Sequence, residues 1–192
     1  DSPTECQFAM TPSFCAQVYE AQACIPSYRE WFLHKASYLP AFGHEKRLLQ
    51  LLQAHAPGRW TLKNPWHPLY LDDLTTVFPD AQLAMTHRDP VDVVGSACSL
   101  IKAVRRMYSD EVDLETIGRQ MVETFTLMIE RQNAYRDRHG AHAIFDIHYE
   151  EQMRDPIGQM KKLYRHFDEP FTAAAENAMA AYLARNPKDK HG

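Results

Sequence analysis

The sequence predicts an α/β fold in which a parallel β-sheet is flanked by helices. Three observations lead to this expectation. Short apolar runs alternate with amphipathic stretches of helical period along the last two thirds of the chain. Proline or a capping residue stands at the start of most helical stretches, where helix N-termini favour them. The 192 residues, of which 45% are hydrophobic and 24% charged, are enough for one domain with a core.

The first third of the chain is expected to be helical. Thr11 and Pro12 form a cap followed by a first-turn proline, and Pro26 opens a second helical element. Residues 44–55 carry leucines at the spacing of one helix face. Gly58 then ends this helical block, since glycine adopts the backbone conformations that terminate helices.

Strands and helices alternate from residue 60 onward. The expected strands are short apolar runs at residues 60–63, 82–87 and 143–148. The expected helices occupy residues 68–78, 90–108 and 114–139, and two more open at Asp155-Pro156 and at Thr172. Helices between strands provide the crossovers that parallel strands need. All strands should therefore run the same way and end at one edge of the sheet.

Composition and charge exclude several classes of function. The formal net charge is −4, so no nucleic-acid or polybasic membrane surface is expected, because both need clustered lysine and arginine. No stretch approaches the roughly 20 apolar residues of a membrane-spanning helix. The four cysteines form no CxxC pair and are interpreted as reduced thiols, as in a cytoplasmic protein.

A candidate anion site lies in the loops after the strands, because ligands bind at the carboxyl ends of parallel strands. Arg88 stands between a strand end and a helix start whose free N–H groups favour negative charge. Its guanidinium fork suits a phosphate, Ser96 offers a hydroxyl on the same helix, and Lys63 ends the first expected strand. Three alternatives stay open: Arg88 pairs with Asp89 or Asp92, Ser96 only packs, and Lys63 is a solvated strand end.

Several segments, in this order, carry a resemblance to a known family. They are Trp60-Thr61-Leu62-Lys63-Asn64-Pro65, Phe78-Pro79-Asp80-Ala81, Thr86-His87-Arg88-Asp89-Pro90 with Val93-Val94-Gly95-Ser96, Ile147-His148-Tyr149-Glu150-Glu151 with Asp155-Pro156, and residues 186–192. Their order and spacing resemble the sulfotransferases that use 3′-phosphoadenosine 5′-phosphosulfate (PAPS), in particular the bacterial branch related to tyrosylprotein sulfotransferases. The resemblance covers nearly the whole chain and implies a P-loop-NTPase-like parallel sheet flanked by helices.

The resemblance implies which residues bind the nucleotide. Arg88 and Ser96 match the pair that holds the 3′-phosphate of PAPS. Tyr149 matches an aromatic or hydrogen-bonding residue near the adenosine. Lys190 and Gly192 match the start of a late loop that also closes over the 3′-phosphate.

The resemblance also implies which residues catalyse the transfer. Lys63 matches the catalytic lysine near the transferring sulfuryl group. Glu5 falls where related sequences place an acidic cluster that includes the general base. His67 and His87 are alternative bases, because imidazole titrates near neutrality. No metal is expected to take part.

One part of the family pattern is absent from the sequence, namely the first strand and the Gly/Ser/Thr-rich loop that binds the 5′-phosphosulfate. The chain also starts without methionine and stops at Gly192. We therefore expect one domain over residues 1–192, truncated at both ends and inactive alone. Within it, residues 1–58 are expected to form a helical acceptor-side region and residues 59–192 a nucleotide-binding α/β core.

Other functions remain to be compared with sulfuryl transfer. The tripeptide His87-Arg88-Asp89 also occurs in the catalytic loop of protein kinases, but that loop needs an asparagine where Val94 stands. Phosphoryl transfer in general would need magnesium ligands that the sequence does not place. The remaining alternative is a non-catalytic interaction or regulatory module that keeps the fold. The acceptor hydroxyl is that of a small molecule, a carbohydrate, a lipid or a peptide, and the oligomeric state is open. The aromatic residues of the first third are expected to be core or interface.

Overall fold

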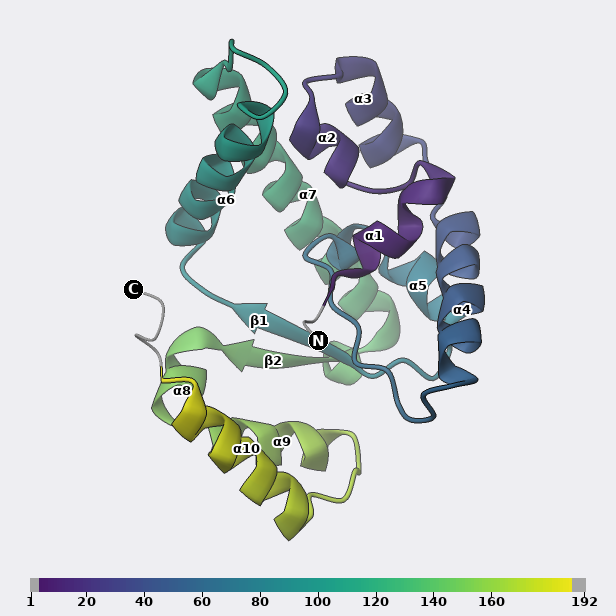
Figure 1. The fold of residues 1–192 in the computed structure, drawn as a ribbon, viewed down its shortest axis with the longest axis vertical. Helices are drawn as coiled ribbons and strands as arrows, with labels where there is room; N and C mark the ends of the chain where they lie inside the picture. Colours follow the sequence, from purple (N-terminus) through teal and green to yellow (C-terminus); the bar gives the residue numbers. More distant parts are fainter. Residues whose placement is uncertain (1–3, 188–192) are drawn as a thin grey trace. The chain divides into compact units, whose positions relative to one another are not determined.

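The computed structural model describes residues 4–187, which form two compact units (Figure 1). The helical unit comprises residues 1–81 and 90–140, and the strand unit comprises residues 82–89 and 141–192. The boundary expected at residue 58, between an acceptor-side region and a nucleotide-binding core, stays a prediction.

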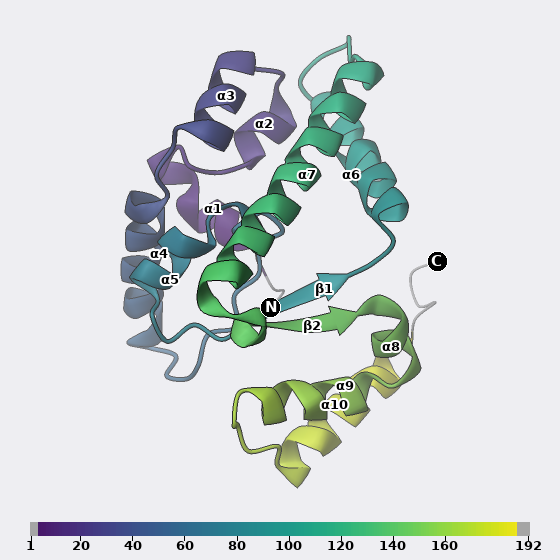
Figure 2. The same ribbon diagram turned by 180° about the vertical axis from the view of Figure 1, so that it is seen from behind.

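The helical unit is an all-α assembly around one long helix. Its helices are α1 (Cys6–Met10), α2 (Val18–Gln22), α3 (Pro26–His34), α4 (Leu39–Gln53), α5 (Leu71–Val77), α6 (Pro90–Arg105) and α7 (Leu114–His139), with 3₁₀ turns η1 (Thr11–Ser13) and η2 (His67–Leu69). α7 packs along α6, as Figure 2 shows, and α4 contacts both α1 and α5. The long predicted helix at residues 114–139 is confirmed.

The strand unit contains the parallel pair that the sequence predicts. β1 (Leu83–His87) pairs with β2 (Ile144–His148), with Leu83 opposite Ile144 and His87 opposite His148. The 3₁₀ turn η3 (Ala141–Ala143) precedes β2, and α8 (Tyr149–Arg154), α9 (Pro156–His166) and α10 (Ala173–Arg185) follow it. Both α8 and α9 contact β2. A small parallel sheet flanked by helices is thus confirmed.

Aromatic rings in mutual contact form the core of the helical unit. Phe32 is fully buried, and its ring centroid lies 5.6 Å from those of Tyr28 and Tyr38 and 6.0 Å from that of Tyr70. The Tyr70 hydroxyl donates to the Phe32 carbonyl, so the polar end of this buried ring is satisfied. Trp31 is 37% exposed at the edge of the cluster. Most of the aromatic rings in this region are therefore structural.

Two buried arginines connect four helices of the same unit. Arg29 in α3 is 7% exposed and pairs with the buried carboxylate of Glu20 in α2. Its guanidinium also donates to Glu123 at 2.8 Å and to Thr124 at 2.8 Å in α7. Arg105 in α6 donates to the Glu20 carbonyl at 3.1 Å. Arg105 donates to neutral oxygens, and its Nε and the Glu20 Oε2 atom are buried without a partner among the described residues, so the network fixes how the helices pack at a cost in desolvation.

Capping residues set the helix boundaries. Asp113 accepts hydrogen bonds from the backbone N–H of Glu115 at 3.0 Å and of Thr116 at 3.2 Å, so α7 starts directly after it. Gly140 ends α7 with φ of 91°, a conformation that side chains with a Cβ disfavour. In the strand unit, Asp155 and Thr172 cap α9 and α10 in the same way.

The first predicted strand is wrong. Residues 60–63 form no strand, and all four are exposed, including Trp60 at 39% and Leu62 at 36%. A strand exists only where another strand pairs with it, and within residues 4–187 the backbone of this segment instead accepts one hydrogen bond, from the Cys6 N–H to the Lys63 carbonyl at 3.1 Å. Apolar alternation therefore marked an extended segment rather than a sheet element.

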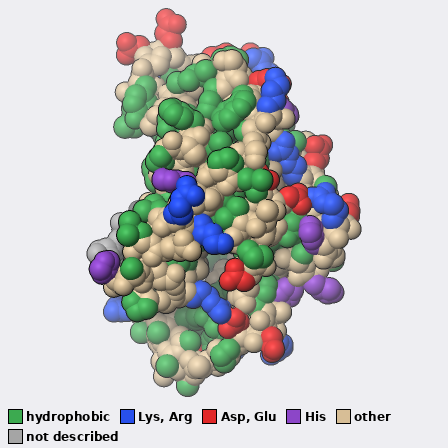
Figure 3. All heavy atoms as spheres, turned by 90° about the vertical axis from the view of Figure 1, so that its right-hand side faces the viewer, with side chains coloured by type: hydrophobic (Ala, Val, Ile, Leu, Met, Phe, Trp, Pro, Cys, Tyr) green, Lys and Arg blue, Asp and Glu red, His purple; other side chains and the backbone are tan. Residues whose placement is uncertain are grey.

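The described residues contain no helix long and apolar enough to cross a membrane. All four cysteines are free thiols. On the face shown in Figure 3, basic and acidic side chains are interspersed, and Lys and Arg do not gather into one patch.

Candidate active site

In the strand unit, the carboxyl ends of β1 and β2 carry the predicted nucleotide-binding residues. Arg88 follows the last residue of β1, and Tyr149 follows the last residue of β2. Because the two strands are parallel and in register, both residues leave the sheet at the same edge. The guanidinium carbon of Arg88 lies 5.0 Å from the centroid of the Tyr149 ring, a cation–π contact. The structure thus brings these two residues together.

A second pair of side chains occupies the last register position of the sheet. The rings of His87 and His148 stack with centroids 5.2 Å apart. His87 Nε2 lies 2.6 Å from Asp146 Oδ1, close enough for the imidazole N–H to donate to the carboxylate. His87, proposed from the sequence as an alternative base, is therefore already engaged at this nitrogen.

In the helical unit, the two predicted catalytic residues form an ion pair. Lys63 Nζ contacts the Glu5 carboxylate, although the residues are far apart in the chain. Gln7 Nε2 donates to the other Glu5 oxygen at 2.5 Å, and the Cys6 N–H donates to the Lys63 carbonyl at 3.1 Å. The lysine side chain is 66% exposed and the glutamate side chain 27% exposed. A base and a cation thus stand side by side within reach of solvent.

A buried carboxyl group lies behind this pair. Glu45 of α4 is 1% exposed and shares a side-chain hydrogen bond with Cys6, the neighbour of Glu5. Burial away from water raises the pKa of the Glu45 carboxyl, and it also raises the pKa of the Cys6 thiol, in which the Glu45 hydrogen bond adds to the effect. Oε2 of Glu45 has no hydrogen-bond partner within residues 4–187. The buried Glu45 carboxyl group therefore holds its proton more tightly than an ordinary glutamate does.

His67, the other alternative base, is poorly suited to take a proton. Burial lowers its pKa to about 4, so the imidazole is neutral at pH 7 and weakly basic. Its Nε2 is buried and has no partner in the described part of the chain. Its ring contacts Phe42 with centroids 6.0 Å apart, so it packs against the apolar face of α4.

The remaining predicted site residues fall in different places. Ser96 is exposed on α6 and belongs to the helical unit, whereas Arg88 belongs to the strand unit. Lys190 and Gly192 lie outside the residues that the structure describes. The roles predicted for all three stay predictions.

Sequence reasoning missed Glu45, Cys6 and Asp146. One signal was present for Glu45, because it lies three residues after Phe42 on the helix face that is buried. A polar residue on an apolar helix face is a buried polar group in need of a partner. No comparable signal marked Asp146, whose partner His87 is 59 residues away in the chain.

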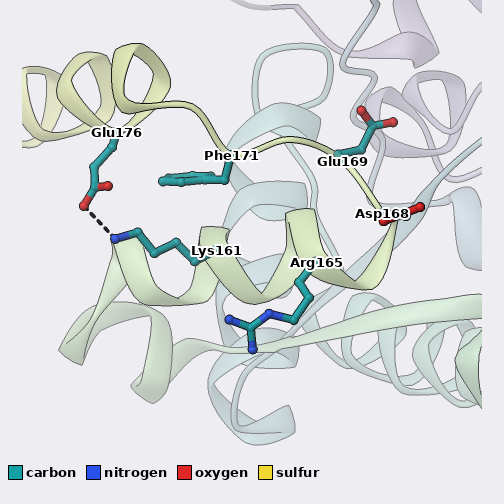
Figure 4. Close-up of a pocket in the computed structure, with 6 residues that line it drawn as sticks. All are labelled: Lys161, Arg165, Asp168, Glu169, Phe171 and Glu176. Carbon is teal, nitrogen blue, oxygen red and sulfur yellow. Dashed lines mark hydrogen bonds and ion pairs between the residues drawn. The ribbon is translucent and has the colours of Figure 1, made fainter.

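A hollow of about 460 Å³ in the strand unit is a different place from these strand ends. Figure 4 shows the residues that line it, with Lys161 paired to Glu176 at 2.7 Å beneath the ring of Phe171. Gln82, before β1, bonds Glu169 of its rim at 2.8 Å, so the hollow lies near the amino end of β1. Ligands of parallel sheets bind at the other end of the strands, so the hollow is not the candidate active site.

Known proteins resemble the chain over nearly its whole length. The family described as "Sulfotransferase family" matches residues 1–173. The crystal structure of sulfotransferase STF9 from Mycobacterium avium superimposes with a TM-score of 0.94 at 34% identity, over 98% of this chain and 49% of that one. The structure of sulfotransferase STF1 from Mycobacterium tuberculosis H37Rv gives 0.85 at 32% identity, over 93% of this chain and 49% of that one.

A curated relative gives a shorter match. Omega-hydroxy-beta-dihydromenaquinone-9 sulfotransferase Stf3, from Mycobacterium tuberculosis and from Mycobacterium bovis, is 29% identical over 106 residues, which is 55% of this chain and 27% of that protein. The chain therefore spans about half the length of the two solved relatives, and the match spans about a quarter of the curated one.

Proposed function

Because the chain belongs to the sulfotransferase family, we propose that it takes part in transfer of a sulfuryl group from PAPS to the hydroxyl group of an acceptor. The observation that supports this role best is the Lys63–Glu5 ion pair. Two residues to which the family resemblance gives complementary catalytic roles contact each other across 58 positions of sequence.

The proposed reaction is a direct displacement at sulfur. The acceptor oxygen forms a bond to sulfur while the bond from sulfur to the bridging oxygen of the nucleotide breaks. Glu5 accepts the proton of the acceptor hydroxyl. Lys63 donates to the bridging oxygen as negative charge accumulates on the departing 3′,5′-bisphosphate. Lysine and arginine side chains supply the positive charge in this scheme, so no metal is part of it.

The Glu5–Lys63 ion pair is weak enough to separate when the substrates bind. Both side chains reach solvent, where an ion pair is worth about 1 kcal/mol or less. A donor that offers Lys63 an anionic oxygen therefore replaces the pair at little cost. The carboxylate is then released to face the acceptor.

Arg88 is proposed to hold the 3′-phosphate, with Ser96, Lys190 and Gly192 as further ligands. A guanidinium donates two parallel hydrogen bonds to a phosphate, and such charged bonds contribute about 1.5 to 3 kcal/mol each. Tyr149 is proposed to lie near the adenosine. Its contact with Arg88 supports a second contribution, that of fixing the guanidinium before the nucleotide arrives.

We infer that residues 1–192 bind the nucleotide but do not transfer the sulfuryl group alone. The sequence contains no Gly/Ser/Thr-rich loop to bind the 5′-phosphosulfate, and such backbone N–H groups stabilise the charge that moves during transfer. A small-molecule hydroxyl is the favoured acceptor, since one relative is named for a hydroxylated menaquinone. A cytoplasmic location is compatible with four free thiols.

The test is a comparison of two variants in a protein that joins this chain to a strand and a phosphosulfate loop. Lys63→Ala should lower kcat by about 10² to 10³ and leave the affinity for adenosine 3′,5′-bisphosphate unchanged. Arg88→Ala should weaken that affinity by about tenfold or more. Lys35→Ala is the matched control, because Lys35 is 63% exposed and also paired, to Glu30 at 3.2 Å. A Lys63→Ala enzyme with unchanged kcat would refute the assignment.

A further inference from the structure

Three polar side chains lie close together at the carboxyl end of the sheet in the strand unit. Side chains of a strand alternate between its faces, so Asp146 and His148 of β2 point to the same face. His87 of β1 is the register partner of His148, and its ring stacks on that of His148 with centroids 5.2 Å apart. His87 Nε2 also lies 2.6 Å from Asp146 Oδ1. At their carboxyl ends, β1 and β2 are thus held together by side-chain contacts as well as by backbone hydrogen bonds.

The residues that directly follow His87 and His148 are those of the proposed nucleotide site. Arg88 comes directly after His87, and Tyr149 comes directly after His148. The Arg88 guanidinium lies 5.0 Å from the Tyr149 ring centroid. Any shift of His87 relative to β2 therefore moves the base of the arginine side chain relative to the ring on which it stacks.

A contribution to folding stability alone does not explain the His87–Asp146 hydrogen bond. The His87 side chain is 34% exposed and the Asp146 side chain 39% exposed, and ion pairs with such access to water contribute little to folding. A carboxylate on a strand that ends at a phosphate-binding edge also repels the ligand through space. The hydrogen bond from His87 offsets this repulsion. Through the same bond the carboxylate fixes the position of the His87 side chain.

We propose that His87 and Asp146 are positioning residues that hold Arg88 in place to receive the 3′-phosphate of the nucleotide. This inference rests on the proposed function, because it assumes that Arg88 binds that phosphate. An arginine side chain has many rotamers, and a site that fixes it beforehand loses less entropy when the ligand binds. Removing the His87–Asp146 bond should therefore weaken binding without removing any group that touches the ligand.

The test is isothermal titration calorimetry of the chain with adenosine 3′,5′-bisphosphate. Asp146→Ala should weaken binding about 3- to 10-fold, since one partly exposed charged hydrogen bond is lost. Asp146→Asn keeps an oxygen that accepts from His87 Nε2 and should restore affinity to within about twofold of the wild type. In the Arg88→Ala background, Asp146→Ala should have no further effect, because the arginine through which it acts is gone.

A second measurement follows Arg88 without any ligand. The ¹⁵N relaxation of its Nε–Hε group should show a lower order parameter in Asp146→Ala than in the wild type and in Asp146→Asn. Far-UV circular dichroism of each variant verifies that the fold is kept.

The outcomes separate this inference from the function on which it rests. If Arg88→Ala loses affinity and Asp146→Ala does not, the positioning role is refuted and the proposed function stands. If Asp146→Asn is as weak as Asp146→Ala, the hydrogen bond is not the cause and the inference is also refuted. If the wild type does not bind the bisphosphate, or Arg88→Ala binds it unchanged, the proposed function fails and the inference fails with it.

Discussion

Replacing the buried carboxyl group of Glu45 by an amide should change how stability depends on pH. Glu45 is 1% exposed and shares a side-chain hydrogen bond with Cys6, next to Glu5. Burial raises the pKa of its carboxyl group above the ordinary value, and no described cation offsets that burial. Glu45→Gln keeps the shape of the side chain and the ability to hydrogen-bond to Cys6 but removes the ionisation.

The sign of the effect follows from proton counting. Above the ordinary carboxyl pKa of 4.5 the unfolded chain loses the Glu45 proton, while the folded chain keeps it until the raised pKa is reached. In that window the folded state binds more protons, so its stability falls by about 1.4 kcal/mol per pH unit. His67, whose pKa is lowered to about 4, acts in the opposite direction between about pH 4 and 6.5 and partly masks this slope.

The assay is therefore a difference between two proteins at each pH. Urea unfolding followed by tryptophan fluorescence reports on the helical unit, because all three tryptophans, Trp31, Trp60 and Trp66, belong to it. The stability gain of Glu45→Gln over the wild type should be small near pH 4.5 and grow by about 1.4 kcal/mol per unit until the folded pKa is reached.

The control for this experiment is an exposed glutamate. The Glu115 side chain on α7 is 80% exposed and pairs with Arg119 at 2.8 Å, so Glu115→Gln should leave the pH dependence nearly unchanged. A difference between Glu45→Gln and the wild type that stays constant from pH 4 to 7 would show that the buried carboxyl group titrates alike in both states. That result would refute the account given for Glu45.

Two further predictions concern the fold. Phe32→Ala should lower the free energy of unfolding by about 3 to 5 kcal/mol, since the ring is fully buried among three others. The control Phe14→Ala, at a side chain that is 66% exposed, should lower it by less than about 1 kcal/mol. Urea titration measures both values. Gly118→Ala should raise the free energy of unfolding by about 0.5 to 1 kcal/mol, because the glycine is inside α7 with open space around it. Gly140→Ala should lower it by about 1 to 3 kcal/mol, because the backbone φ of 91° at this position disfavours a residue with a Cβ. Similar thermal midpoints for the two glycine variants would contradict this reasoning.

The helices were predictable where local chemistry decides them. α7 begins after the Asp113 cap and ends before Gly140, and both signals are readable in the sequence. The strand predicted at residues 60–63 is wrong because strand formation depends on a pairing partner that a local pattern does not show. The short helix α8 was missed, since six residues after a strand carry too little periodicity.

The candidate site was predictable one residue at a time but not as an arrangement. Arg88 followed from a basic residue between a strand and a helix start, and Lys63 and Glu5 followed from family resemblance. The contacts between Glu5 and Lys63, or between Cys6 and Glu45, connect segments whose approach depends on tertiary packing. The sequence carries the chemistry of each group, and the fold decides which groups meet.

The most direct test of the central claim is whether Arg88 recognises the 3′-phosphate of a nucleotide. Calorimetry would compare adenosine 3′,5′-bisphosphate with adenosine 5′-monophosphate, in the wild type, in Arg88→Ala and in the control Arg185→Ala, whose side chain is exposed on α10. We expect the wild type and Arg185→Ala to prefer the bisphosphate by about tenfold or more, and Arg88→Ala to lose this preference. An undiminished preference in Arg88→Ala would show that Arg88 does not recognise the 3′-phosphate.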